Sequence, residues 1–154
     1  MNCSGTVLES DYIAAQYLHM KPRKAFTIIG LVLIFLSTIT LVIWFSWLML
    51  ACLGYLLVFY FILVPWRAAK TYRQYKAIQD PITIELKDSG ILSSSKNGSG
   101  IIEWNAIRKI KKNKKLLLVY PADSLFHIFP SHFFENDKEF IFFAKRVESE
   151  HEKT

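Results

Sequence analysis

The stretch "AFTIIGLVLIFLSTITLVIWFSWLMLACLGYLLVFYFILVPW", residues 25–66, decides the fold of this chain. It holds no Asp, Glu, Lys, Arg or His over about 42 residues, whereas one helical crossing of a bilayer needs about 20. One straight helix of this length would be roughly 63 Å long, about twice the hydrocarbon thickness. A helix pair buried in a soluble protein would show regularly spaced polar residues, which are missing here. We therefore predict two transmembrane helices, residues 25–44 and 47–66, joined by a turn.

Two tryptophans mark the expected turn. Indole rings favour the membrane–water interface, so Trp44 and Trp47 place the reversal between the two helices, where Ser46 adds a hydroxyl. Alternatively, these rings face lipid or pack between helices. The hairpin is then still predicted from the length of the apolar stretch. A lipoprotein signal cleaved at Cys52 is disfavoured because "LGYLLVFYF" continues the apolar run. With Cys3 as the other cysteine, no disulfide framework is expected.

Basic residues flank the apolar stretch at both ends, and the expected turn carries no charge. Positive residues stay on the cytoplasmic side of a membrane, so both termini should be cytoplasmic. The net charge of +6 then belongs to the cytoplasmic face, where each basic side chain near anionic lipid contributes about 1 kcal/mol. The topology-determining residues are Lys21, Arg23 and Lys24 before the first helix and Arg67, Lys70, Arg73 and Lys76 after the second.

Residues 1–24 form an N-terminal cytoplasmic segment with one short amphipathic helix. The sequence "ESDYIAAQYLHMKP" contains good helix formers, with Ser10 as the expected N-cap and Pro22 as the stop. We expect His19 at the surface. The helix lies on the membrane or packs on the rest of the chain, and both remain open. Its expected contact face consists of Ile13, Gln16, Tyr17 and Met20.

Beyond the apolar stretch we predict a helical stalk, residues 67–79, and a cytoplasmic β-sheet domain, residues 80–154. The domain alternates apolar and polar residues in short runs separated by turns at 88–90, at Asn97-Gly98 and near Asn113. This pattern predicts six short strands in an antiparallel sheet or a small, partly open barrel. The runs are 82–87, 91–95, 101–104, a run containing Ile107 and Ile110, 116–120 and 125–129.

A final helix closes the domain. Asn136 is its predicted N-cap, and Glu139 three residues later is close to a capping box. The i, i+3, i+4, i+7 spacing predicts one buried face that lies across the sheet, formed by Phe140, Phe143, Ala144 and Val147. The fold class is therefore a membrane α+β protein.

Several short motifs resemble one family. The runs "WNAI", "LLLVYP" and "IFPSHFF", behind an N-terminal helix and a two-span hairpin, resemble the YcxB-like bacterial membrane proteins. The resemblance implies a small pleckstrin-homology-like cytoplasmic domain, tethered to the bacterial inner membrane. The family brings no assigned activity and no catalytic residue; Trp104, Ile107, Pro130 and Phe133 match its pattern as core or turn positions. Six strands rather than seven would make this an incomplete version of that fold.

The sequence offers little for catalysis. It lacks a Gly-rich phosphate loop, a His-Glu-x-x-His motif and a Cys-x-x-Cys motif. Asp123, His127, Ser131 and His132 lie close in sequence, but strand alternation favours exposure of His127. A metal bound by His127 and His132 would lack a third ligand. We expect no enzyme activity, no cofactor and no metal.

One candidate binding site remains in the run "RKIKKNKK". Such a run is typical of a solvated hairpin whose charges deter edge pairing. For a tethered domain, it also predicts a patch that attracts anionic lipid. No aromatic residue is interleaved to stack on bases, so nucleic acid is not expected. The candidate residues are Arg108, Lys109, Lys111, Lys112, Lys114 and Lys115.

These features favour a non-enzymatic membrane protein whose domain binds anionic lipid head groups or a membrane protein partner. An alternative is an immunity or stress-protection protein that acts against a membrane-active toxin. A membrane enzyme ranks last because no ionisable residue lies within 25–66. Gly30, Ala51 and Gly54 allow close helix approach within the hairpin or with other helices, which leaves the oligomeric state open.

Overall fold

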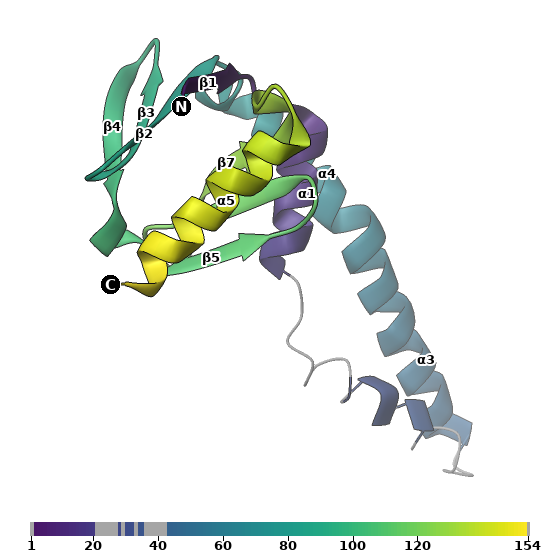
Figure 1. Ribbon diagram of the computed structural model, residues 1–154. Coiled ribbons are helices and arrows are strands. Elements are labelled where there is room, and N and C mark those ends of the chain that lie inside the picture. Colours follow the sequence, from purple (N-terminus) through teal and green to yellow (C-terminus); the bar gives the residue numbers. More distant parts are fainter. Residues whose placement is uncertain (1, 21–27, 29, 33, 36–42, 154) are drawn as a thin grey trace.

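The computed structural model describes residues 2–20, 28, 30–32, 34–35 and 43–153. In Figure 1 a body of strands and helices sits at one end of a long helix, and the chain is an α+β protein with antiparallel sheets. The predicted first transmembrane helix, residues 25–44, falls largely outside the described residues, as do Lys21, Arg23 and Lys24.

The long helix is built from three consecutive pieces. They are α3 (Ile43–Val58), a π-helical turn (Phe59–Leu63) and α4 (Val64–Gln74), together called the rod here. Among the described residues one segment, Leu50–Gln74, is long and apolar enough to cross a membrane by its length and composition. Large apolar side chains such as Leu56 and Phe61 are exposed along the rod.

The predicted turn at Trp44–Trp47 is wrong. The rod is already helical from Ile43, so the chain runs straight through both tryptophans. No residue of this stretch breaks a helix, since Trp, Phe, Leu and Met are ordinary helix residues and Ser46 carries only a small penalty. Residues 36–42, which precede the rod, lie outside the described part of the chain.

Helix α1 (Glu9–Met20) packs between the rod and the body rather than standing alone. The Leu8 N–H donates to the Asp11 carboxylate at 2.9 Å, so Leu8 precedes the helix and the predicted N-cap Ser10 lies in its first turn. Ala15 and Leu18 form the buried face, in place of the predicted one. Small alanines allow a close approach to the sheet, which a search for large apolar residues overlooks.

In the described part of the chain, seven strands form two antiparallel sheets, one more strand than predicted. The four-stranded sheet has the order β1 (Asn2–Gly5), β2 (Ile82–Lys87), β3 (Gly90–Ser95), β4 (Gly98–Glu103). The three-stranded sheet has the order β5 (Lys109–Lys112), β6 (Leu116–Tyr120), β7 (His127–Pro130). Strand β1 was missed because "NCSG" has no alternation; it pairs Cys3 with Ile84 along the edge of β2.

Local details of the sheets differ from the prediction by one to three residues. Ser95 pairs with Gly98, so the β3–β4 loop is Lys96-Asn97, one residue earlier than expected. Trp104 opens a 3-10 turn (Trp104–Ala106) instead of ending a strand, and its indole N–H donates to the Asp88 carbonyl at 2.9 Å. Glycine is required at position 90, because a Cβ on that residue would lie 2.2 Å from the Ile102 carbonyl oxygen.

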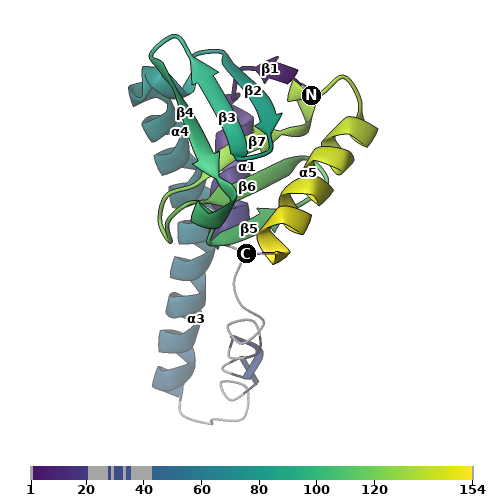
Figure 2. The same ribbon diagram turned by 60° about the vertical axis from the view of Figure 1, so that its left-hand side comes forward.

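Helix α5 (Asp137–Glu152) follows a short 3-10 turn (Ser131–Phe133) and covers the core. The Asn136 side chain accepts from the Glu139 N–H at 2.9 Å, which confirms the predicted cap. The four predicted contact residues are buried: Phe140, Phe143, Ala144 and Val147. Figure 2 shows α5 lying across β5 and β6.

The folded body extends beyond the predicted domain boundary at residue 80. Strand β1 completes the first sheet, and α1 covers β6 of the second through Leu116, Leu118 and Tyr120. We call β1–β7 with α1 and α5 the domain. Residues 80–154 alone would leave these apolar side chains exposed, so experiments on the domain need the N-terminal segment.

Candidate functional site

The end of the domain from which the rod emerges carries the candidate site. We call this end the base; it consists of β5 and the C-terminal turn of α1, His19 and Met20. Figures 1 and 2 both show β5 at this end, on the same side as α3. Strand β5 is an edge strand that pairs with β6 alone among the described strands, so its other edge faces outward.

Alternation along β5 sends its side chains to two different faces. Ile110 packs against the core, and Lys112 on the same face forms an ion pair with Glu148 of α5 at 2.5 Å. Lys109 and Lys111 point the other way, toward α1 and Tyr120. The lysines of β5 are therefore two sets rather than one patch.

Lys111 caps α1. Its ammonium donates to the main-chain carbonyls of Leu18 at 3.1 Å and His19 at 2.5 Å. These belong to the last carbonyls of α1, which have no partner within the helix and carry its negative dipole end. This lysine therefore fixes the end of α1 to the base.

His19 lies at the centre of an aromatic cluster at the base. Its Nδ1 is 3.0 Å from the Tyr120 hydroxyl, and its ring stacks on Tyr120 and Phe126. Burial, followed by the charges of Lys111 and Lys109, lowers the pKa of His19 below 6.5. Lys109 lies over the Tyr120 ring, 5.7 Å from its centroid. Contrary to the prediction, His19 is only partly exposed, because it closes this cluster.

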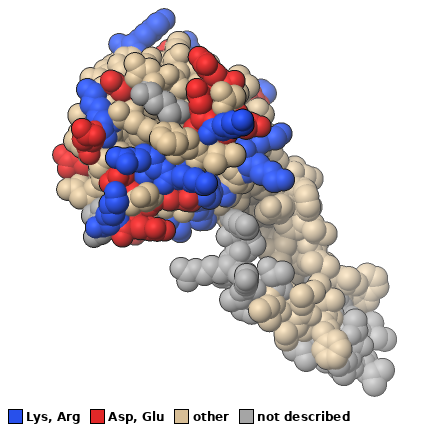
Figure 3. All heavy atoms as spheres, viewed as in Figure 1, with Lys and Arg blue, Asp and Glu red and all other residues tan. Residues whose placement is uncertain are grey.

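The remaining predicted residues lie around the β5–β6 hairpin. Arg108, Lys114 and Lys115 are exposed, and the Asn113 side chain shapes the tip by accepting from two main-chain N–H groups at 2.8 Å each. Lys112 and Lys114 border a groove of about 560 Å³ beside α5. Figure 3 shows Lys and Arg side chains as a band over this side of the domain, with acidic side chains at its margins.

Comparison with known families identifies part of this domain. Residues 86–145 match the family model described as YcxB-like protein. This stretch is similar to the YcxB-like family, and we call residues 86–145 the YcxB-like region. The match runs from β2 to α5 and includes the "WNAI", "LLLVYP" and "IFPSHFF" motifs. No curated protein and no solved structure matches the chain.

The YcxB-like region contains β5 and the basic run, whereas β1, α1 and the rod lie outside it. The base is therefore assembled from two parts of the chain. The contribution of α1 to the base was not predicted, because nothing in "YLHM" indicates that this segment contacts β5. The one available signal is the pair of alanines, Ala14 and Ala15, which marks a helix face suited to close packing.

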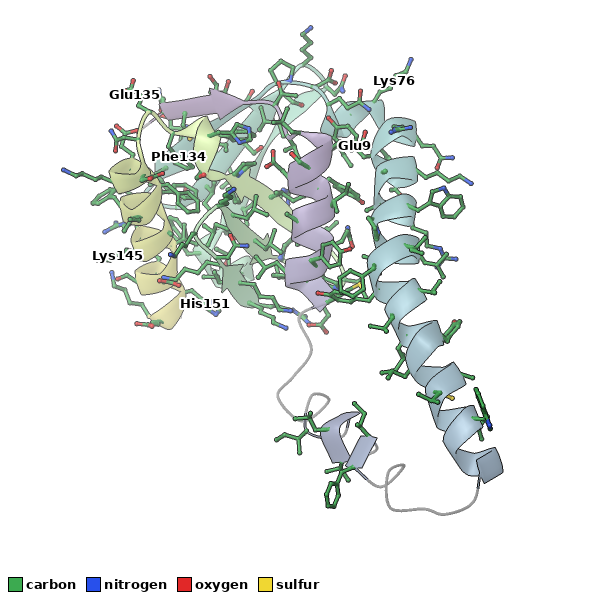
Figure 4. All side chains as sticks on the ribbon, turned by 90° about the vertical axis from the view of Figure 1, so that its right-hand side faces the viewer. Glu9, Lys76, Phe134, Glu135, Lys145 and His151 are labelled. Carbon is green, nitrogen blue, oxygen red and sulfur yellow. The ribbon has the colours of Figure 1, made fainter. Side chains whose placement is uncertain are left out.

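The predicted topology-determining residues on α4 and directly after it have individual surroundings. Arg73 forms an ion pair with Glu9 of α1 at 3.2 Å, and Lys70 lies over the Trp66 ring, 5.4 Å from its centroid. Arg67 and Lys76 are exposed. The ion pair joins α4 to α1 next to the YcxB-like region, and Figure 4 shows Glu9 at the same end of the domain as Lys76.

The residues considered for hydrolysis or metal binding have separate surroundings. His132 approaches Thr6 and Asp11, with its Nε2 3.7 Å from the carboxylate. His127 is half-buried in a cavity instead of exposed, because this end of β7 faces the space between the sheets. Within the described part of the chain, no three His, Cys, Asp or Glu side chains are grouped to hold a metal ion.

Proposed function

We propose that this chain is a non-enzymatic integral membrane protein whose tethered domain binds anionic lipid head groups through its base. The observation that carries the proposal is that the lysine-rich edge strand β5 and the apolar rod lie at the same end of the domain. A surface held near lipid phosphates needs only weak attraction to adopt a fixed orientation.

Contacts along the rod indicate how deep it would insert. Helix α1 contacts the rod from Tyr60, beside Tyr17, up to Arg73, beside Glu9. The rod below these contacts, residues 43–59, is about 25 Å long at 1.5 Å per residue, close to the hydrocarbon thickness of about 30 Å. We infer that the membrane surface lies near Phe59. This position is earlier in the chain than residue 66, the predicted end of the span.

The finer architecture is part of the same proposal. A first span within residues 25–44 would pair with the rod as a hairpin, and the flanking basic residues favour cytoplasmic termini in a bacterial inner membrane. Seven strands in sheets of four and three, closed by α5, support a pleckstrin-homology-like fold better than the six strands predicted from sequence.

Hydrogen–deuterium exchange of the full chain in nanodiscs tests the lipid interaction. Outward-facing amides of β5 should exchange more slowly in nanodiscs that contain anionic lipid than in zwitterionic ones. The double change Arg108→Ala, Lys109→Ala should remove the difference, while Lys138→Ala on α5 serves as the charge-matched control. Lys111 is kept because it caps α1. Equal protection in both kinds of nanodisc would exclude anionic lipid as the partner of the base. A membrane protein would then remain as the candidate partner.

A further inference from the structure

A cavity of about 570 Å³ opens between the two sheets, and no side chain of the basic run lines it. Its walls come from α1, the end of α4, β2, β3 and β7 with the segment before it. The volume falls within the range of small-molecule sites, about 300–1,000 Å³. Neither the YcxB-like match nor the proposed lipid surface at the base accounts for this space.

The lining carries no formal charge. None of the described residues that line the cavity is Asp, Glu, Lys or Arg, although the chain holds 19 Lys and Arg and 13 Asp and Glu. Its two histidines, His19 and His127, both have a pKa below 6.5 because burial disfavours the charged ring. A charged ligand would lose its hydration here without gaining a partner of opposite charge.

The wall combines apolar and polar groups. Ile82, Ile84 and Phe129 supply an apolar surface. His127 makes no hydrogen bond to the described part of the chain, so its neutral ring keeps one donor and one acceptor. Ser93 lines the cavity beside Ile84, its partner in the antiparallel pair of β2 and β3.

We propose that this cavity binds one uncharged amphipathic molecule, with its apolar body against Ile82, Ile84 and Phe129 and its hydrogen-bonding group at His127 and Ser93. None of the basic side chains of the base lines this cavity, and His19 is the residue that the two sites share. Loss of lipid binding through Arg108 and Lys109 would therefore leave the cavity lining unchanged.

The four histidines of the chain provide an internal test. In the full chain, labelled at histidine and held in nanodiscs, n-octanol is the uncharged probe. Imidazole NMR signals of His127 and His19 should shift with saturation. Those of His132 and His151, which do not line the cavity, should stay in place. Movement of all four signals together, or of none, would overturn the proposal.

Two adjacent serines provide matched variants. Alternation puts Ser93 on the cavity side of β3 with the buried Ile91, and Ser94 on the opposite face. Ser93→Trp fills the cavity and should abolish the octanol shifts, whereas Ser94→Trp should retain them. Unchanged His132 and His151 signals report that both variants are folded. Retention of the shifts in a folded Ser93→Trp protein would contradict the proposed position.

The charge class is tested with octanoate, which has the same chain length and is ionised at neutral pH. Its apparent Kd should be about tenfold or more above that of n-octanol, because the carboxylate finds no cation in the lining. Equal affinity for the two probes would contradict the proposal that the ligand is uncharged.

Discussion

The Tyr17 hydroxyl donates a hydrogen bond to the main-chain carbonyl of Tyr60 at 3.0 Å. That carbonyl has lost its partners within the rod: the Val64 N–H donates to Phe59 instead, and Pro65 has no N–H. The two tyrosine rings also contact each other, with centroids 5.0 Å apart. Helix α1 therefore supplies the donor that the π-helical turn lacks, which joins the domain to the rod.

Removal of the Tyr17 hydroxyl should weaken this junction. Tyr17→Phe keeps the ring contact and should lower the free energy of unfolding by about 1 kcal/mol, the usual net value of one hydrogen bond. The cost should shrink in a Pro65→Ala background, where a restored N–H can serve the carbonyl. Thermal unfolding of the full chain in detergent measures both. An equal cost in the two backgrounds would mean that Pro65 does not create the need for Tyr17.

Two neighbouring lysines of β5 should differ in their contribution to stability. Lys111→Ala removes two bonds to the carbonyls of α1 and should cost about 1–2 kcal/mol. Lys112→Ala breaks an ion pair whose side chains are 47% and 32% exposed, and such pairs contribute at most about 1 kcal/mol. Chemical unfolding compares the variants. A larger loss for Lys112→Ala would contradict the capping role of Lys111.

Two adjacent phenylalanines of α5 provide a test of the core. Phe143 is 1% exposed and contacts Phe129 and Phe134, whereas Phe142 is 62% exposed. Phe143→Ala should cost about 3–5 kcal/mol through the cavity it leaves. Phe142→Ala should change stability by about 0.5 kcal/mol or less. Similar losses for both changes, measured by unfolding, would show that α5 does not pack as described.

Acid should destabilise the domain through His19, whose pKa is lowered below 6.5 in the folded state by burial, Lys111 and Lys109. Between the folded and unfolded pKa values the unfolded chain binds more protons. This contribution is complete above about pH 6.5 and is lost as the pH falls through the folded value. Unfolding measured from about pH 7 down to about pH 5 should show the loss, and His19→Gln should reduce it. An unchanged pH dependence in that variant would exclude His19 as its source.

Local patterns were predicted well, and long-range contacts were not. The Asn136 cap and the spacing of Phe140 to Val147 are set within one helix, so sequence alone located α5. Strand β1 depends on the pairing of Cys3 with Ile84, about half the chain away, and nothing in "NCSG" itself predicts that pairing. The same limit applies to α1, whose contact face is Ala15 and Leu18.

The basic run illustrates a different limit. Arg108 to Lys115 are neighbours in sequence, yet alternation along β5 turns Lys111 toward α1 and Lys112 toward α5. The prediction that His127 is exposed failed in a similar way. Strand alternation gave the face of β7 on which His127 lies, but it did not show that this face borders a cavity. Charge counts alone therefore overstated the size of one continuous patch.

Membrane insertion of the rod is tested most directly with a nitroxide spin label on Cys52 of the native chain in liposomes. Cys3 should remain unlabelled at neutral pH, because its thiol is buried and burial raises its pKa to about 11. The Cys52 label should collide often with oxygen and rarely with a water-soluble nickel complex. A label at Lys96→Cys, in a Cys52→Ser background, should do the reverse. Equal access of the nickel complex to both positions would contradict a rod that lies in the lipid bilayer.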